Sequence, residues 1–278
     1  MYFAGVDIGS RMTKVVIMDE AILASLVAAT GPEQRKLAYK VMEEALTRAG
    51  LSFDDITYVV ATGYGRINVP FADKQITEIS CHARGVGYLL PTARTVIDIG
   101  GQDCKAIKLN NGRPVDFVMN DKCAAGTGRF LELMAEGLGV KLEDMGTLSL
   151  AAKNRVVISN TCTVFAEQEA VAKLSEGVPV EDLVAGLHEA IATRIYAMAS
   201  RLKIEKDVAV TGGGAKNIGL VRALEAKLGY SVLIPPDPLV TGAIGAALLG
   251  RDAAQQAIKS GLPLVRSERR LQETKFFV

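Results

Sequence analysis

The sequence contains no tryptophan, and aromatic residues make up only 5% of its 278 residues. Proteins that bind single-stranded nucleic acid usually stack the bases on aromatic side chains, and this chain offers few of them. Its charges nearly cancel, with 32 Lys and Arg against 31 Asp and Glu. A strongly basic surface for a nucleic acid is therefore not indicated either, and we expect no nucleic-acid partner.

Long hydrophobic runs are also absent: none reaches the roughly 18 residues expected of a transmembrane helix. The first residues, MYFAGVDIGS, lack the basic start of a signal peptide. We therefore expect no membrane association and a cytoplasmic location. The chain has four cysteines and no CxxC motif, so neither a disulfide scaffold nor a zinc ribbon or ferredoxin-type site within one chain is predicted.

The clearest positive feature is an internal repeat. VDIGSRMTKVVIMD at 6–19 aligns without gaps with IDIGGQDCKAIKLN at 97–110. Each copy is an apolar stretch, a glycine turn and a second stretch, which predicts a β-hairpin. Chance similarity between two short hairpins is the alternative, but the repeat favours two related domains. We place the first domain at 1–95 plus 238–278 and the second at 96–237.

Strand and helix patterns alternate along the chain, which predicts the α/β class. Strands running into glycine turns are expected at 56–66 and 207–217, and a further strand at 231–235. Helices are expected at 32–50, 78–90, 124–137, 163–175, 181–203, 218–228 and 240–250. The basic segment 251–278 fits a partner-docking tail, but a solvated final helix with a loose end explains the same composition.

Both hairpins carry an aspartate just before the glycine turn, in Asp7-Ile8-Gly9-Ser10 and Asp98-Ile99-Gly100-Gly101. Glycine lets backbone N–H groups approach phosphate oxygens, and the carboxylate can hold Mg²⁺ directly or through water. Two such loops facing one another would hold a triphosphate from both sides. Lys14 and Lys105 either neutralise phosphate or solvate the second strand, and Gln102 is placed to orient an attacking water.

A third glycine turn, TGGGAKN at 211–217, is expected to end a strand and open a helix. Three glycines leave no side chain between the backbone and an adenosine. The sequence has no GxxxxGK[ST], so a P-loop is excluded.

These three glycine turns, in this order, resemble the actin, sugar kinase and Hsp70 ATPase superfamily. The resemblance implies a two-domain actin/Hsp70-like ATPase fold with duplicated domains, in which the hairpins bind phosphate and the third turn binds adenosine. Glu78 stands where the superfamily often keeps a carboxylate near the metal. The candidate catalytic residues are Asp7, Asp98 and Gln102, with Glu78 and both aspartates near Mg²⁺. The candidate ATP contacts are Gly9, Ser10, Lys14, Gly100, Gly101, Gly126, Thr127, Gly128, Gly212, Gly213, Gly214, Lys216 and Asn217.

The cysteines divide into two pairs. Cys81 and Cys104 fit buried, unreactive thiols. Cys123 and Cys162 each stand where a helix is expected to begin, the second with Ser159, Asn160 and Thr161 as candidate caps, and the positive end of a helix favours a thiolate. A cubane cluster usually needs four thiolates; one chain offers two such positions, and a two-fold dimer offers four. Spacing alone does not decide between a shared cluster and ordinary thiols.

Four segments closely resemble the ATP-dependent activators of 2-hydroxyacyl-CoA dehydratases: ATGYGR (61–66), IDIGGQDCK (97–105), NDKCAAGTGRFLE (120–132) and SNTCTVFAEQE (159–169). The same group includes the ATPase subunits of benzoyl-CoA reductases and the reductases of double-cubane cluster proteins. The resemblance extends from about residue 3 to 250; the short segment 18–30 and the basic tail depart from it. It implies a homodimer with one bridging [4Fe-4S] cluster, ligated by Cys123 and Cys162 of each subunit.

The function implied by this resemblance is low-potential electron transfer driven by ATP hydrolysis. Electrons would pass from a ferredoxin or flavodoxin through the cluster to an iron–sulfur acceptor enzyme, whose identity the sequence does not specify. Two alternatives stay open. A sugar or acid kinase of the same superfamily would use Asp98 as a base, although no sugar-binding signature is recognisable. A non-enzymatic ATP-binding scaffold would assemble with partners without redox activity.

Overall fold

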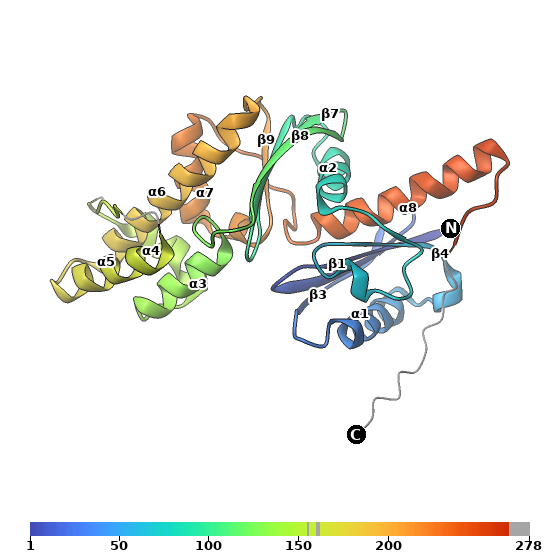
Figure 1. Cartoon of the computed structure of the whole chain (residues 1–278), viewed down its shortest axis with the longest axis horizontal. Helices are drawn as coiled ribbons and strands as arrows, with labels where there is room; N and C mark the ends of the chain where they lie inside the picture. Colours follow the sequence, from blue (N-terminus) through green and yellow to red (C-terminus); the bar gives the residue numbers. More distant parts are fainter. Residues whose placement is uncertain (155, 160–161, 267–278) are drawn as a thin grey trace, which may run out of the picture. The chain divides into compact units, whose positions relative to one another are not determined.

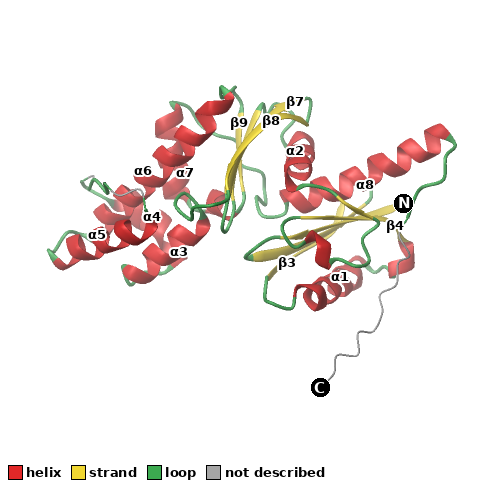
Figure 2. Ribbon diagram, in the orientation of Figure 1, coloured by secondary structure: helices red, strands yellow, loops and turns green. Residues whose placement is uncertain are grey.

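The computed structural model describes residues 1–154, 156–159 and 162–266, which form an α/β chain of two compact units (Figure 1). Unit 1 contains Met1–Pro91, Asn110–Pro114 and the residues from Leu239 onward, and unit 2 contains Thr92–Leu109 and Val115–Pro238. Each unit has its own sheet and its own helices (Figure 2). Within the described ranges, no helix combines the length and the apolar character needed to cross a membrane.

The sheet of unit 1 has five strands in the order β3-β2-β1-β4-β5. Strands β1 and β2 form an antiparallel hairpin, β3 extends it, and β4 lies parallel to β1 on the other side. The strands are β1 (Tyr2–Ile8), β2 (Met12–Met18), β3 (Ile22–Ala29), β4 (Ile56–Thr62) and β5 (Lys74–Gln75). The central strands are buried nearly throughout, as their continuous Val- and Ile-rich runs predict.

The α-helices in the described part of unit 1 are α1 (Gln34–Ala49), α2 (Glu78–Leu89) and α8 (Thr241–Ser260). Glycines allow α8 to lie directly against β1 and α2. A Cβ atom on Gly5 would stand 1.9 Å from the Ala243 carbonyl oxygen, and one on Gly245 would stand 1.7 Å from that of Cys81. The small-residue sequence of α8 therefore permits a close packing that any larger side chain at these positions would prevent.

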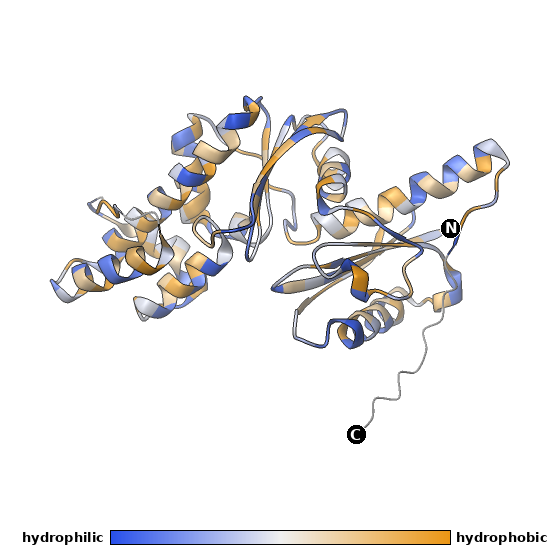
Figure 3. Cartoon of the chain, in the orientation of Figure 1, coloured by the Kyte–Doolittle hydropathy of each residue, from blue (hydrophilic) through white to orange (hydrophobic). Residues whose placement is uncertain are grey.

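Unit 2 has a four-stranded sheet in the order β8-β7-β6-β9 and a group of helices. The strands are β6 (Thr95–Ile99), β7 (Cys104–Asn110), β8 (Arg113–Asn120) and β9 (Val208–Thr211). The helices are α3 (Gly128–Gly137), α4 (Met145–Ala151), α5 (Thr163–Ser175), α6 (Val180–Ala199) and α7 (Ile218–Leu228). Hydrophobic and hydrophilic positions alternate along α5 and α6 (Figure 3), and the apolar face of α6 joins the core through Leu187, Ile191 and Ile195.

Both predicted hairpins are present, and they match in detail. Asp7 lies opposite Lys14 in the β1–β2 ladder, and Asp98 lies opposite Lys105 in the β6–β7 ladder. The Gly9 N–H donates to the Met12 carbonyl at 3.0 Å, and the Gly100 N–H makes the equivalent bond to Asp103 at 2.9 Å. The sequence repeat is therefore a structural repeat, with one copy in each unit.

Some predicted elements differ from the structure. Segment 231–235 was expected to be a strand, but only Leu233 pairs, as an isolated bridge to Ala209. Pro235 and Pro236, two and three residues after Leu233, have no N–H to continue a ladder. The helix expected from 240 to 250 extends to Ser260, while residues 267–278 of the basic tail lie outside the described part.

Strands β3, β5 and β8 and helix α4 were not predicted. The helix expected from 124 begins only at Gly128. Gly126 has a φ of 95°, which a right-handed helix does not accommodate, so the chain is still in a loop at that point.

Candidate functional site

The first predicted phosphate loop lies at the end of β1. Asp7 is buried, and its Oδ2 atom accepts a hydrogen bond from Lys14 Nζ at 3.0 Å. The pair forms because the two residues face each other across the hairpin. Lys14 therefore compensates the Asp7 charge rather than solvating the outer surface of its strand. Gly9 and Ser10 are half-buried in the turn that follows.

Two glycines that the sequence analysis did not select approach the Asp7 carboxylate. Gly63 follows β4 with a φ of 84°, and a Cβ atom there would stand 2.5 Å from Asp7 Oδ1. Gly242, at the start of α8, would place a Cβ atom 3.2 Å from Asp7 Oδ2. Each glycine follows a threonine, in Thr62-Gly63 and Thr241-Gly242, but a dipeptide is too short to identify these positions from the sequence alone.

Glu78 opens α2, after the N-cap Thr77. Cys81 lies one turn further along the helix. Its burial raises the pKa of its thiol to about 12, and the negative charges of Asp7 and Glu78 raise this pKa further, by less than burial does. Unit 1 therefore brings Asp7, Lys14 and Glu78 into one region, with Cys81 as a buried neutral thiol beside them.

The second phosphate loop is built on the same plan but carries an additional charge. Lys105 Nζ lies 3.1 Å from Asp98 Oδ2 and 2.6 Å from Asp103 Oδ2, and the Lys105 side chain is only 2% exposed. The first copy has Met12 where the second has Asp103. The second loop thus encloses two carboxylates and one ammonium group, and Lys105 is a buried structural cation rather than a solvating one.

Both oxygens of Asp98 have partners. Oδ2 is bound by Lys105, and Oδ1 accepts a hydrogen bond from the Thr211 hydroxyl at 2.8 Å. A magnesium ion that took an Asp98 oxygen as a direct ligand would displace one of these partners. Contact through a metal-bound water requires no such change, and Mg²⁺ usually retains several waters.

The second loop also holds the start of α3. The Gly128 N–H donates to the Gly100 carbonyl and the Arg129 N–H donates to the Gly101 carbonyl, both at 2.8 Å. Thr127 is the N-cap residue of this helix and its hydroxyl donates to the Ala124 carbonyl. The structure therefore joins Gly100, Gly101 and Gly128, while Gln102 stands exposed at the tip of the turn.

The predicted adenosine turn follows β9. Gly212 has a φ of 79°, and a Cβ atom on it would stand 2.4 Å from the Ile99 carbonyl oxygen and 2.9 Å from Asp98 Oδ1. Gly213 is exposed, and Gly214 packs so closely on Ile99 that a Cβ atom would meet its side chain at 2.4 Å. The turn is thus in contact with the second phosphate loop.

Two polar residues end this turn. Lys216 is largely exposed, and its Nζ atom lies 3.7 Å from Asp237 Oδ1. Asn217 caps α7: its Oδ1 accepts the Leu220 N–H at 3.0 Å, and its Nδ2 lies 3.0 Å from His188 Nε2. Since the amide nitrogen can only donate, His188 accepts at Nε2 and is neutral. Burial favours the same state and lowers the pKa of His188 to about 4.

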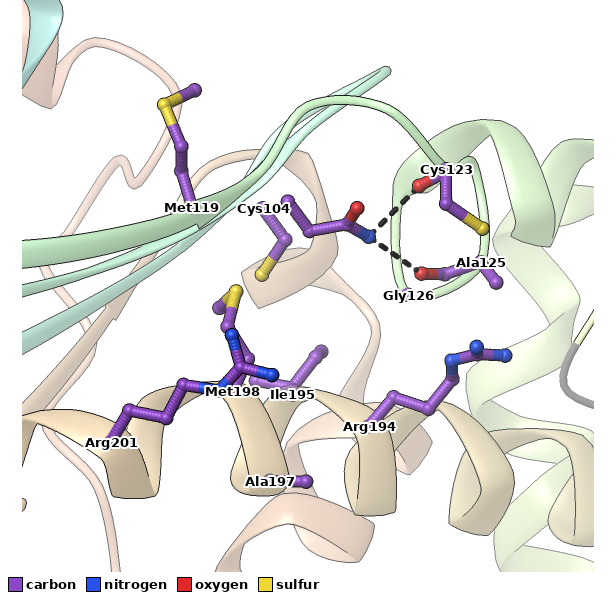
Figure 4. Close-up of a pocket in the computed structure, with 11 residues that line it drawn as sticks. Cys104, Met119, Cys123, Ala125, Gly126, Arg194, Ile195, Ala197, Met198 and Arg201 are labelled. Atoms are coloured by element: carbon purple, nitrogen blue, oxygen red, sulfur yellow. Dashed lines mark hydrogen bonds between the residues drawn. The ribbon is translucent and has the colours of Figure 1, made fainter.

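The cluster candidates Cys123 and Cys162 both belong to unit 2, and both are exposed free thiols. Cys162 stands at the start of α5, as predicted, and is itself the N-cap residue of that helix. Cys123 is not at a helix start: it lies in the loop before α3, five residues ahead of Gly128. The Asn120 side chain fixes this loop by donating to the carbonyls of Cys123 and Ala125 at 2.9 and 3.1 Å (Figure 4).

The other two cysteines are buried, as predicted. Burial raises the pKa of Cys104 well above its ordinary value, so its thiol stays protonated. Cys123 and Cys162 are the two thiols accessible to an inorganic ligand. In the described ranges, no three His, Cys, Asp or Glu side chains are grouped closely enough to hold a metal ion. A four-thiolate cluster at these positions therefore requires a second chain.

Comparisons with known proteins show the family and the fold of the chain. The sequence model of the BadF/BadG/BcrA/BcrD ATPase family matches residues 4–250. The chain is 47% identical over 262 residues to the 2-hydroxyisocaproyl-CoA dehydratase activator of Clostridioides difficile, covering 93% of this chain and 98% of the relative. A solved structure of the activator of the 2-hydroxyisocaproyl-CoA dehydratase from Clostridium difficile, with bound ADPNP, superposes with a TM-score of 0.88 at 46% identity, covering 94% of this chain and 98% of that one.

A more distant likeness supports the fold alone. A ROK family glucokinase from Streptomyces griseus aligns with a TM-score of 0.57 at 14% identity, covering 91% of this chain and 100% of that one. The predicted actin/Hsp70-like ATPase fold is thereby confirmed. With a family model covering most of its length, and a relative that is nearly half identical across almost its whole chain, the protein belongs to the BadF/BadG/BcrA/BcrD ATPase family.

Proposed function

We propose that this protein is an ATP-driven electron donor that activates an iron–sulfur acceptor enzyme. The observation that carries the proposal is the pair of exposed thiols, Cys123 and Cys162, in the same unit as the second phosphate loop. The dehydratase-activating function of a relative with 47% identity supports it. The acceptor is an iron–sulfur enzyme such as a 2-hydroxyacyl-CoA dehydratase, a benzoyl-CoA reductase or a double-cubane cluster protein.

ATP binding is assigned to the two phosphate loops and the adenosine turn. The N–H groups of Ser10 and Gly101 are proposed to contact phosphate, and Gly212–Asn217 to contact adenosine. Since the Gly9 and Gly100 N–H groups already close their own hairpin turns, their part is to hold the turn that the neighbouring backbone uses. Gly128 bonds the second loop at the start of α3, and Gly126 and Thr127, which lead into that helix, are proposed to contact ATP beside it.

Mg²⁺ would be held through water by Asp7 and Asp98, with Glu78 as a further carboxylate on the side of Asp7. Both aspartates are buried and already paired with lysine, so they present oriented oxygens without a large uncompensated charge. Gln102 is exposed at the turn and is proposed to orient the attacking water. The metal neutralises charge that develops on the transferring phosphoryl group.

Cys123 and Cys162 would hold one [4Fe-4S] cluster together with the same residues of a second copy of the chain. When bound, such a cluster supplies one-electron transfer at low potential. The chain contributes two thiols free of disulfides and, at Cys162, the positive end of α5, which stabilises a thiolate. ATP drives the process only if it binds the acceptor-docking conformation more tightly than the resting one.

A sugar or acid kinase remains the second candidate, because the fold is shared with a glucokinase. It would require Asp98 to accept a proton from a hydroxyl group. Both Asp98 oxygens are already occupied by Lys105 and Thr211, which disfavours that role. Formation of a phosphorylated small molecule from ATP would support the kinase.

The experiment compares Cys123→Ser with Asp7→Asn in anaerobically purified protein. Cys123→Ser is expected to keep ATP binding and to lose electron transfer to an added 2-hydroxyacyl-CoA dehydratase. Asp7→Asn is expected to keep the iron content and to lose ATP hydrolysis. Full dehydratase activation by Cys123→Ser would contradict the proposal, as would unchanged ATP hydrolysis by Asp7→Asn.

A further inference from the structure

A cavity of about 370 Å³ opens beside the Cys123 loop, within unit 2. One wall is the loop itself, from Cys123 to Gly126, and the opposite wall is the face of α6 that carries Arg194 and Met198 (Figure 4). Cys104 and Met119 contribute from the sheet. The volume falls in the range of ordinary ligand pockets.

The charged side chains that line the cavity, Arg194 and Arg201, are both positive. Arg194 and Arg201 are seven residues apart, so they stand two turns apart on the same side of α6 and its continuation, and both side chains rise toward the strand and loop (Figure 4). The residues that line the cavity include no Asp or Glu. The remaining surface is apolar and rich in sulfur, from Cys104, Met119 and Met198.

Two guanidinium groups over an apolar floor are complementary to a carboxylate on a short apolar stem, since the planar fork of arginine binds carboxylates in pairs of hydrogen bonds. An Asp or Glu side chain of a partner protein has this chemistry. The position of the cavity narrows the choice of partner protein. Its wall contains the exposed thiol of Cys123, a proposed cluster ligand, so a protein bound there lies beside the cluster.

We propose that this cavity is the docking site for an acidic side chain of the small electron-carrier protein that reduces the cluster. This inference rests on the proposed function. In the complex, one electron leaves the reduced carrier and enters the cluster held by Cys123 and Cys162. The carrier departs oxidised by one electron, and no bond is formed or broken. Arg194 and Arg201 steer the encounter and fix its orientation.

The test uses the cluster-loaded homodimer, the double variant Arg194→Gln/Arg201→Gln, and a reduced bacterial two-cluster ferredoxin as the probe. Arg222→Gln is the matched control, because Arg222 is an exposed arginine of α7 that does not line this cavity. Cluster reduction is followed by stopped-flow absorbance at several salt concentrations. Reduced methyl viologen, a small cation with no carboxylate, serves as the reductant that needs no docking site.

At low salt we expect the double variant to react with ferredoxin about tenfold or more slowly and to lose most of its salt dependence, as for other steered encounters. The viologen rate, the midpoint potential of the cluster and basal ATP hydrolysis are expected to stay unchanged. Binding of oxidised ferredoxin, measured by calorimetry, should weaken in parallel, and this measurement does not require a working cluster.

Three results would overturn the inference. An unchanged ferredoxin rate would show that the carrier docks elsewhere. Equal slowing with viologen, together with a shifted midpoint potential, would show that the arginines act on the cluster instead. Loss of the dimer in light scattering would show that a second copy of the chain occupies the cavity. If the protein binds no iron but the ferredoxin affinity still depends on both arginines, the proposed function fails while the docking site stands.

Discussion

Lys105 offers the sharpest test of the second phosphate loop. Its ammonium group is the cation between the carboxylates of Asp98 and Asp103, and its side chain is 2% exposed. Replacing it with methionine leaves two neighbouring buried carboxylates without that partner. Breaking a buried ion pair from one side costs about 3–5 kcal/mol, so we expect Lys105→Met to lower the free energy of unfolding by this amount.

The repeat supplies a matched control. Lys14 stands at the equivalent position, but it is 14% exposed and holds the single carboxylate of Asp7. Lys14→Met should therefore cost less, about 1.5–3 kcal/mol, the value of one charged hydrogen bond. Urea denaturation followed by circular dichroism measures both variants.

A second substitution makes the prediction specific. Met12 occupies the first-copy position of Asp103, so Asp103→Met removes the additional carboxylate with a side chain that the repeat already accepts. The double variant Asp103→Met/Lys105→Met should lose less stability than the sum of the losses of Asp103→Met and Lys105→Met, by about 0.5–3 kcal/mol, a typical coupling energy for residues in contact. Strictly additive effects would refute the proposed charge network.

Two further predictions concern other buried groups of unit 2. Because burial lowers the pKa of His188 from 6.5 to about 4, the unfolded chain binds the proton more tightly, so stability falls as the pH drops below 6.5. The loss should reach about 2 kcal/mol at pH 5 and be absent from His188→Gln in urea denaturation at pH 7 and pH 5. Gly212→Ala should weaken ATP binding in calorimetry, since its Cβ atom would stand 2.4 Å from the Ile99 carbonyl oxygen; Gly229→Ala, with a similar φ of 78° and no atom within 4 Å, should leave ATP binding unchanged.

The elements that were predictable carry strong local signals. The Asp-x-Gly hairpins were visible because the same residues occur twice, and their cross-strand Asp–Lys pairs follow from the hairpin register. Helix α1 ends at Gly50, whose left-handed φ of 67° is the usual conformation after a helix end. Helix α5 begins after Cys162 as expected.

What was missed depends on contacts between distant segments. Thr62-Gly63 and Thr211-Gly212 both lie beside a phosphate-loop aspartate, so the repeat extends beyond the hairpins. The matching segments, 62–65 and 211–214, are only four residues long, and they differ at one position, Tyr64 against Gly213. A match this short could not be identified from the sequence alone.

The position of Cys123 could not be read from composition. Helix formers and a glycine pair suggested a helix start, but the loop conformation depends on the positive φ of Gly126 and on the Asn120 side chain. Both are local features of an irregular loop, and they leave no periodic signal in the sequence. The caps proposed at Asn160 and Thr161 lie outside the described residues.

The central claim, one cluster shared by two chains, is tested most directly by iron and sulfide analysis of anaerobically purified protein whose mass is measured by light scattering. The account predicts a homodimer with about four iron and four sulfide per two chains. It also predicts that both Cys123→Ser and Cys162→Ser abolish this content. An iron-free protein after anaerobic reconstitution, or a full cluster in each isolated monomer, would contradict it.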